Sequence, residues 1–173
     1  MPLDAIIRAQ LSWAKSCWPA HADRRAPSLD ANLILPMPPE VRGQCEAGGG
    51  GELGTPRRPG KMSSLRSSSA LAYNFFAPWI GHDLHPLAAA LGHQRDDDTL
   101  QFERKFPHGL STMPPNLDVT LDNQQPRPLA IEYLDDAIEF NAVSYQQAFA
   151  RLLHAREPMP GYFDYLVSRY FGG

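Results

Sequence analysis

Two carboxylate residues, Asp118 and Glu132, lie in short stretches where apolar and polar side chains alternate. Such alternation is typical of strands with one buried face. If the two stretches pair as an antiparallel hairpin with Leu121 opposite Leu129, then Asp118 lies opposite Glu132, on the face away from the apolar side chains. Facing carboxylates repel each other, but they offer the oxygen ligands that Mg²⁺ and Mn²⁺ prefer. The pattern therefore predicts a divalent-metal site, where the ion could activate water and stabilise a phosphoryl transition state.

Three strands in a row are predicted by this alternation, over residues 100–106, 117–121 and 129–134. Glu103 and Lys105 share the polar face of the first strand. If this strand lies beside the hairpin, Glu103 becomes an accessory acid of the site and Lys105 can bring a positive charge to it. The simpler alternative is that Lys105 is a solvated charge on an edge strand.

A simpler interpretation of the acidic pair also stays open. Strands often carry one solvated face, and two acids on such a face need no function. The register of the hairpin is decisive as well. A slip of one residue would turn Asp118 to the opposite face and separate it from Glu132.

Segments with apolar residues at helical spacing precede and follow the three predicted strands. Apolar residues at three- and four-residue steps predict an amphipathic helix near the start of the chain. Ser144 with Gln147 has the pattern of a capping box before a later helix. The predicted helices cover residues 3–18, 67–76, 86–91, 144–156 and 163–170.

The first 61 residues differ in composition from the rest of the chain. Residues 1–61 hold 8 of the 17 prolines and 7 of the 13 glycines and carry a net charge of +2, whereas residues 62–173 carry −5. Proline and glycine at this density interrupt helices and strands. We therefore expect residues 1–61 to be the amphipathic helix followed by a largely disordered linker, and residues 62–173 to form the folded domain. The sequence leaves open whether the working protein begins near Met62.

Overall charge and cysteine content exclude several classes of protein. A net charge of −3 and a pI of about 6.0 disfavour general nucleic-acid binding by phosphate neutralisation. No apolar run is long enough to span a membrane, and no secretory signal is recognisable. Cys17 and Cys45 are too few for a disulfide scaffold or a four-ligand zinc site. These features predict a cytoplasmic protein without a membrane association.

Four segments resemble, in their order and spacing, a group of bacterial proteins similar to PD-(D/E)XK nucleases. The segments are 67–79, 102–107, 114–119 and 129–132. The resemblance implies an α/β fold with helices around a small mixed sheet, a restriction-endonuclease-like core that is either complete or truncated. In that family the Asp of the second strand and the Glu of the third bind the divalent metal, which implies this role for Asp118 and Glu132.

The chain departs from the family pattern at Leu134. The family has a lysine two residues after the Glu, where it positions or activates the attacking water, and a leucine can do neither. We therefore expect a Mg²⁺- or Mn²⁺-dependent endonuclease acting on DNA, intact or degenerate and weakly active. The predicted catalytic residues are Asp118, Glu132, Glu103 and Lys105. The alternative is a non-catalytic remnant or binding module that keeps the nuclease-like core.

Overall fold

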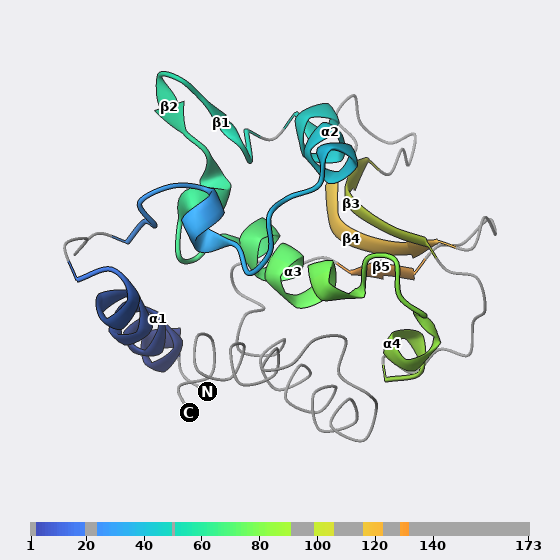
Figure 1. The fold of residues 1–173 in the computed structure, drawn as a ribbon, viewed down its shortest axis with the longest axis horizontal. Coiled ribbons are helices and arrows are strands. Elements are labelled where there is room, and N and C mark those ends of the chain that lie inside the picture. The colour runs from blue at the N-terminus through green and yellow to red at the C-terminus, as the bar shows by residue number, and fades with distance from the viewer. Residues whose placement is uncertain are drawn as a thin grey trace.

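A computed structural model describes residues 3–19, 24–49, 51–90, 99–105, 116–122 and 129–131 (Figure 1). Its helices are α1 (Leu3–Cys17), α2 (Pro39–Gly48), α3 (Ser68–Phe76) and α4 (His85–Ala90), with short 3₁₀ turns η1 (Asp30–Asn32), η2 (Lys61–Ser63) and η3 (Ala77–Trp79). Its strands are β1 (Gly54–Thr55), β2 (Arg58–Pro59), β3 (Thr99–Lys105), β4 (Asn116–Asp122) and β5 (Leu129–Ile131). This small α/β arrangement is the predicted class and is consistent with a restriction-endonuclease-like core.

The larger sheet has the strand order β3-β4-β5, and both of its strand pairs are antiparallel. Leu121 lies opposite Leu129 and Val119 opposite Ile131, so the predicted register of the hairpin is confirmed over the described pairs. Phe102 of β3 lies opposite Val119 on the other side of β4. Val119 and Leu121 are fully buried, as expected for the apolar face of β4.

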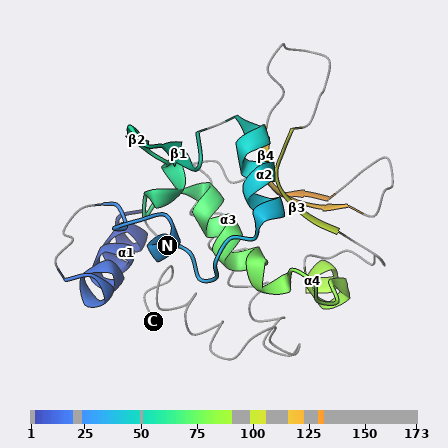
Figure 2. The ribbon, with the colours of Figure 1, turned by 45° about the horizontal axis from the view of Figure 1, so that its top comes forward.

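Helix α3 crosses the middle of the molecule and packs against this sheet (Figures 1 and 2). Its first turn is capped by Ser67, whose hydroxyl accepts a hydrogen bond from the backbone N–H of Ala70 at 3.2 Å. The Tyr73 ring lies 5.5 Å from the Phe102 ring, centroid to centroid, and joins helix to strand. Residues 72–79 are all buried, so α3 and the turn that follows it form the centre of the core.

The structure corrects the expectation that residues 19–61 form a largely disordered linker. Within the described part of that range, Leu33, Met37, Val41 and Cys45 belong to the same buried cluster as α3. Val41 and Cys45 lie one turn apart on α2, and Leu33 and Met37 lie on the segment that leads into it. A boundary at residue 61 or 62 would cut through this core.

The proline and glycine residues that suggested disorder lie at the two ends of α2. Pro39 occupies the first turn, where its missing N–H costs no helical hydrogen bond. Gly49 follows the last turn in a left-handed conformation, with φ of 71°, which is the usual glycine cap. Proline and glycine here start and stop a helix that the sequence analysis missed.

Other sequence predictions have mixed outcomes. The predicted helices over 3–18, 67–76 and 86–91 correspond to α1, α3 and α4. The predicted helices over 144–156 and 163–170 lie outside the described residues. Within the described parts of the chain, no helix is both long and apolar enough to cross a membrane.

Candidate active site

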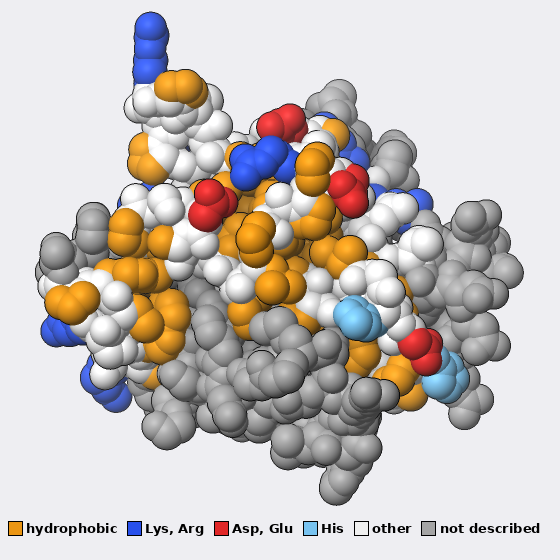
Figure 3. All heavy atoms as spheres, in the orientation of Figure 1, with side chains coloured by type: hydrophobic (Ala, Val, Ile, Leu, Met, Phe, Trp, Pro, Cys, Tyr) orange, Lys and Arg blue, Asp and Glu red, His pale blue; other side chains and the backbone are white. Residues whose placement is uncertain are grey.

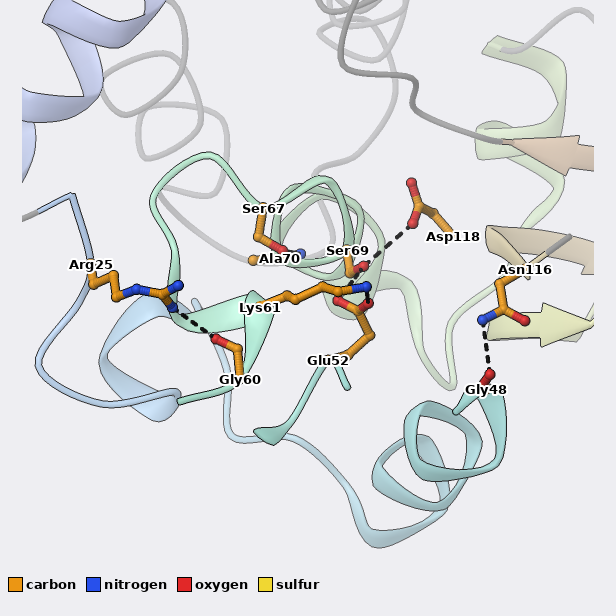
Figure 4. Close-up of polar contacts among 10 residues, drawn as sticks. All are labelled: Arg25, Gly48, Glu52, Gly60, Lys61, Ser67, Ser69, Ala70, Asn116 and Asp118. Carbon is orange, nitrogen blue, oxygen red and sulfur yellow. Dashed lines mark hydrogen bonds and ion pairs between the residues drawn. The ribbon is translucent and has the colours of Figure 1, made fainter. Parts of the chain in front are cut away.

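Asp118 lies on β4, at the point where the sheet meets the first turn of α3. Its side chain is half-buried, and its Oδ1 atom lies 3.4 Å from Oγ of Ser69 on α3 (Figure 4). The strand places Asp118 between the apolar residues Leu117 and Val119, so it faces away from the side of the sheet that they occupy. A helix hydroxyl and a strand carboxylate are therefore the first pair of groups in the candidate site.

Ser69 connects Asp118 to a second carboxylate, Glu52. The Ser69 hydroxyl donates to Oε2 of Glu52 at 2.9 Å, and the Lys61 Nζ donates to Oε1 of the same carboxylate at 3.1 Å. Because the hydroxyl has one proton, the shorter contact to Glu52 is its main hydrogen bond and the contact to Asp118 is the weaker one. Figure 4 shows these four side chains converging from three separate segments.

The backbone around the β1–β2 hairpin fixes Glu52 and Lys61 relative to each other. Glu52 precedes β1 and Lys61 follows β2. The Lys61 N–H donates to the Gly51 carbonyl at 3.2 Å, and the Met62 N–H donates to the Glu52 carbonyl at 3.0 Å. The Glu52 side chain is 8% exposed and that of Lys61 is 62% exposed. A buried carboxylate is thus paired with an ammonium group that reaches the surface.

Glu103 on β3 is the third carboxylate of the site and has an unusual backbone. It lies between the paired positions Phe102–Val119 and Arg104–Leu117, across from Asp118. Its φ of 51° is left-handed, which costs about 1–3 kcal/mol for a residue other than glycine. The residue is only 6% exposed, and its Oε1 atom has no hydrogen-bond partner among the described residues.

The surroundings of Glu103 favour its protonated form. Burial raises the pKa of Glu103 above its ordinary value of 4.5, and the neighbouring Glu52 charge also raises it. Hydrogen bonding with Ser69 and Asp118 and the charge of Lys61 lower the pKa and oppose part of this shift. Glu103 therefore holds its proton to a higher pH than a carboxyl group of ordinary pKa does.

The raised pKa of Glu103 predicts a pH-dependent effect on stability. A carboxyl whose pKa is raised by folding stabilises the fold fully below its unfolded pKa, and this contribution is lost as pH rises through the folded pKa. Glu103→Gln is therefore expected to raise the free energy of unfolding at pH 8 by about 1 kcal/mol, the low end of the cost of an unpartnered buried group. The difference should disappear near pH 4. Urea unfolding at both pH values measures it.

A matched control is Glu46→Gln, because Glu46 is an exposed acid on α2. This variant is expected to follow the unchanged chain at both pH values. A Glu103→Gln variant that is less stable than the chain at pH 8 would contradict the assigned direction of the pKa shift.

The end of α2 closes the outer edge of β3 beside this site. The Phe102 N–H donates to the Gln44 side chain at 2.8 Å, and the Asn116 side chain donates to the Gly48 carbonyl at 2.9 Å. A Cβ on Gly48 would lie 3.2 Å from the Cβ of Glu103, so glycine permits the close approach. Burial raises the pKa of the nearby Cys45 thiol to about 12, which keeps it protonated and unreactive.

The predicted site residues are only partly described. Asp118 and Glu103 lie together, whereas Glu132 lies outside the described residues. Lys105 is exposed, and its Nζ is 3.8 Å from where a Cβ on Gly49 would be. Among the described side chains, Lys105 forms no hydrogen bond or ion pair with either acid.

Three residues of this cluster were missed from the sequence, namely Glu52, Lys61 and Ser69. Glu52 and Lys61 lie in the Pro/Gly-rich stretch that was assigned to a linker, and Ser69 was treated only as part of a helix. The hairpin between Glu52 and Lys61 was the available signal, because Thr55 to Arg58 is a short turn with a proline in it. Within the described ranges, no group of three or more His, Cys, Asp or Glu residues is arranged around one metal position.

Comparison with protein families identifies a match over most of the described chain. Residues 18–133 match the model of a family described as restriction endonuclease associating with ARP. The matched range is more than half of the chain, and it includes α2 and the hairpin as well as the three strands β3, β4 and β5. No match was found among the curated proteins or the solved structures with which the chain was compared.

Proposed function

The chain belongs to the restriction-endonuclease family described as associating with ARP, and on this basis we propose that it is a metal-dependent phosphodiesterase that cleaves DNA. The observation that carries the proposal is the convergence of Asp118, Glu103 and Glu52 from three separate segments. Bringing three acids together is unfavourable for stability alone, because their charges repel. Such an arrangement is typical of sites that perturb carboxyl pKa values for chemistry.

The acids present are suited to a hard divalent cation. Carboxylate oxygens are the ligands that Mg²⁺ and Mn²⁺ prefer, and the Oε1 atom of Glu103 is buried without a hydrogen-bond partner among the described residues. The described acids do not surround one ion by themselves, so the proposal requires Glu132. The β4–β5 ladder pairs residues 119 and 131, and a continuation of this register by one pair would bring Glu132 opposite Asp118. Asp118 and Glu132 would then hold the ion, with Glu103 as an accessory acid.

A bound ion would polarise the scissile phosphate and lower the pKa of a water molecule. The other roles belong to residues of the chain. Ser69 holds Glu52 and limits the rotation of Asp118. Lys61 is the lysine that contacts the acidic cluster in the described part of the chain, and we assign to it the positive charge that Leu134 does not supply. Lys105 stays the candidate from the neighbouring strand.

The proposal is tested by measuring metal binding and cleavage separately. The purified chain is expected to bind Mn²⁺ in calorimetry and to cleave plasmid DNA when Mg²⁺ or Mn²⁺ is added, and Asp118→Ala should lose both properties. The loss of binding is expected because Asp118 is one of the two proposed ligands, and Glu132 with the accessory acid Glu103 would hold a divalent ion weakly. Asp30→Ala is the matched control, since Asp30 is an exposed acid on η1.

The possible results have distinct meanings. Cleavage that persists in Asp118→Ala would show that the site is elsewhere. Mn²⁺ binding that depends on Asp118, without any cleavage, would favour the alternative of a non-catalytic binding module. Loss of both properties in the Asp30→Ala control would point to damage of the fold rather than of the site.

A further inference from the structure

The β1–β2 hairpin projects from the body of the molecule. Figure 1 shows it standing apart from the helices and the larger sheet, and in Figure 3 basic side-chain atoms form the end of the projection at upper left. Residues 55–59 are all exposed. A two-stranded hairpin that buries no apolar surface adds little to stability. Packing therefore does not explain why the chain forms it.

The shape of the hairpin is fixed despite its exposure. At its tip, the Thr55 hydroxyl accepts hydrogen bonds from the backbone N–H groups of Arg57 and Arg58, at 3.3 and 3.2 Å. At its base, Gly54 has a left-handed φ of 79°, and a Cβ there would lie 2.2 Å from the Gly60 nitrogen. Only glycine allows the two strands to come this close.

The base of the hairpin is part of the candidate site. Glu52 and Lys61 flank the two strands and meet in the ion pair described above. The Arg25 guanidinium donates to the Gly60 carbonyl at 3.1 Å and to the Ser63 hydroxyl at 2.9 Å, and so braces the same base. The tip is therefore held in a fixed position relative to Asp118, through Glu52 and Ser69.

The charge of the tip is positive and uncompensated. Arg57 and Arg58 are exposed, and neither takes part in an ion pair with the described residues. Glu52, the acid at the base, is already paired with Lys61. Residues 62–173 carry a net charge of −5, so that part of the chain repels a polyanion. Favourable contact with phosphates has to come from local groups such as these two arginines.

We infer that the β1–β2 hairpin is an arm that binds the phosphate backbone of duplex DNA beside the cleavage site. The inference rests on the proposed function, because it takes DNA as the substrate. Arginine is suited to phosphate because its planar guanidinium can donate two parallel hydrogen bonds. A two-stranded ribbon also fits the width of the major groove. The arm positions the duplex and carries no sequence preference of its own.

DNA binding measured without metal tests the hairpin independently of cleavage. A fluorescent 20-base-pair duplex is titrated with the full chain in EDTA, at several salt concentrations, and anisotropy gives the dissociation constant. Removing two phosphate contacts lowers the slope of log K against log salt by about 1.8. Arg57→Ala with Arg58→Ala is expected to show this change, together with an affinity loss of about tenfold or more at low salt. Arg57→Lys with Arg58→Lys should keep the slope, because it keeps both charges.

The control variant removes two positive charges from α1 instead of the hairpin. Arg8→Ala with Lys15→Ala takes two exposed positive charges from α1 and should leave the slope unchanged. Equal loss in both double variants, no change in the hairpin variant, or no duplex binding by the unchanged chain would each overturn the inference. Failure of the proposed function has another signature, since Asp118→Ala would then leave cleavage intact while the salt slope of the hairpin variant still changed.

Discussion

Lys61→Met is expected to lower metal-dependent DNA cleavage about a hundredfold or more, the usual effect of removing one group that stabilises transition-state charge. The same substitution should raise the affinity for Mn²⁺ severalfold. The Nζ atom of Lys61 lies 3.1 Å from Oε1 of Glu52, and its charge lowers the pKa of Glu103. The same positive charge repels a second cation that would bind at these acids. Opposite changes in turnover and in metal affinity are a result that general damage to the fold would not give.

Lys61→Met also breaks the ion pair with Glu52, so a second variant is needed to separate that effect from the loss of the positive charge. Lys61→Met leaves the Glu52 carboxylate without its counter-ion, and the side chain of Glu52 is 8% exposed. The double variant Glu52→Gln with Lys61→Met removes both charges and should still lose cleavage. Lys105→Met tests the rival candidate on β3, and Lys15→Met is the matched control, because Lys15 is an exposed lysine on α1. Cleavage that survives in Lys61→Met but not in Lys105→Met would assign the cation to β3.

Position 134 offers a complementary test of the same assignment. Leu134→Lys places a lysine where the resemblance to PD-(D/E)XK nucleases predicts one, and it is expected to raise cleavage. The increase should be larger in the Lys61→Met background, because there the cluster has lost its own cation. Equal increases in both backgrounds would show that Lys61 and position 134 act independently.

Asn74→Ala is expected to have the largest effect on stability, a loss of about 2–4 kcal/mol, because it removes the side-chain hydrogen bonds to two backbone groups inside the protein. Asn74 is fully buried on α3. Its Oδ1 accepts the Ile34 N–H at 2.7 Å, and its Nδ2 donates to the Asn32 carbonyl at 2.9 Å. Asn32 in turn donates to the carbonyls of Met62 and Ser64. The pair of asparagines therefore joins the segment before α2 to the rest of the core.

Urea or thermal unfolding measures this loss, and Asn116→Ala is the control. Asn116 is half-buried, and its side chain donates a hydrogen bond to the Gly48 carbonyl. Its removal should cost about 1 kcal/mol, the ordinary worth of one hydrogen bond. Similar losses in both variants would mean that residues 32–34 contribute little to the stability of the core.

Sequence patterns predicted the strands because burial on one face imposes a period of two. The alternation around Val119 and Leu121 set the register with Leu129, and the described ladder has this register. The helix over 67–76 was equally visible from the sequence, and the structure buries Phe75 and Phe76 in it. Each of these signals is local and depends on a strong physical preference.

The rest of the site depends on contacts between distant segments, which no local pattern contains. Glu52 and Lys61 are ordinary charged residues until the hairpin brings them together and α3 presents Ser69. The left-handed backbone of Glu103 is equally hidden, because the sequence at that position alternates like a regular strand. Glycine and proline near α2 suggested that no helix forms there, whereas they mark the two ends of a helix whose apolar side packs in the core.

The site is assembled by closing long loops, and this has a consequence for the order of folding. Ser69 and Asp118 are 49 residues apart in the chain, and Gly48 and Asn116 are 68 apart. Contacts of this range form only after the entropy of loop closure has been overcome, so they arise late relative to helices and turns. The cluster around Asp118 is therefore complete only after the N-terminal segment and β4 have met. A chain that began at Met62 would keep Asp118 but lack Glu52 and Lys61, and a nascent chain would acquire the cluster only after β4 had been synthesised.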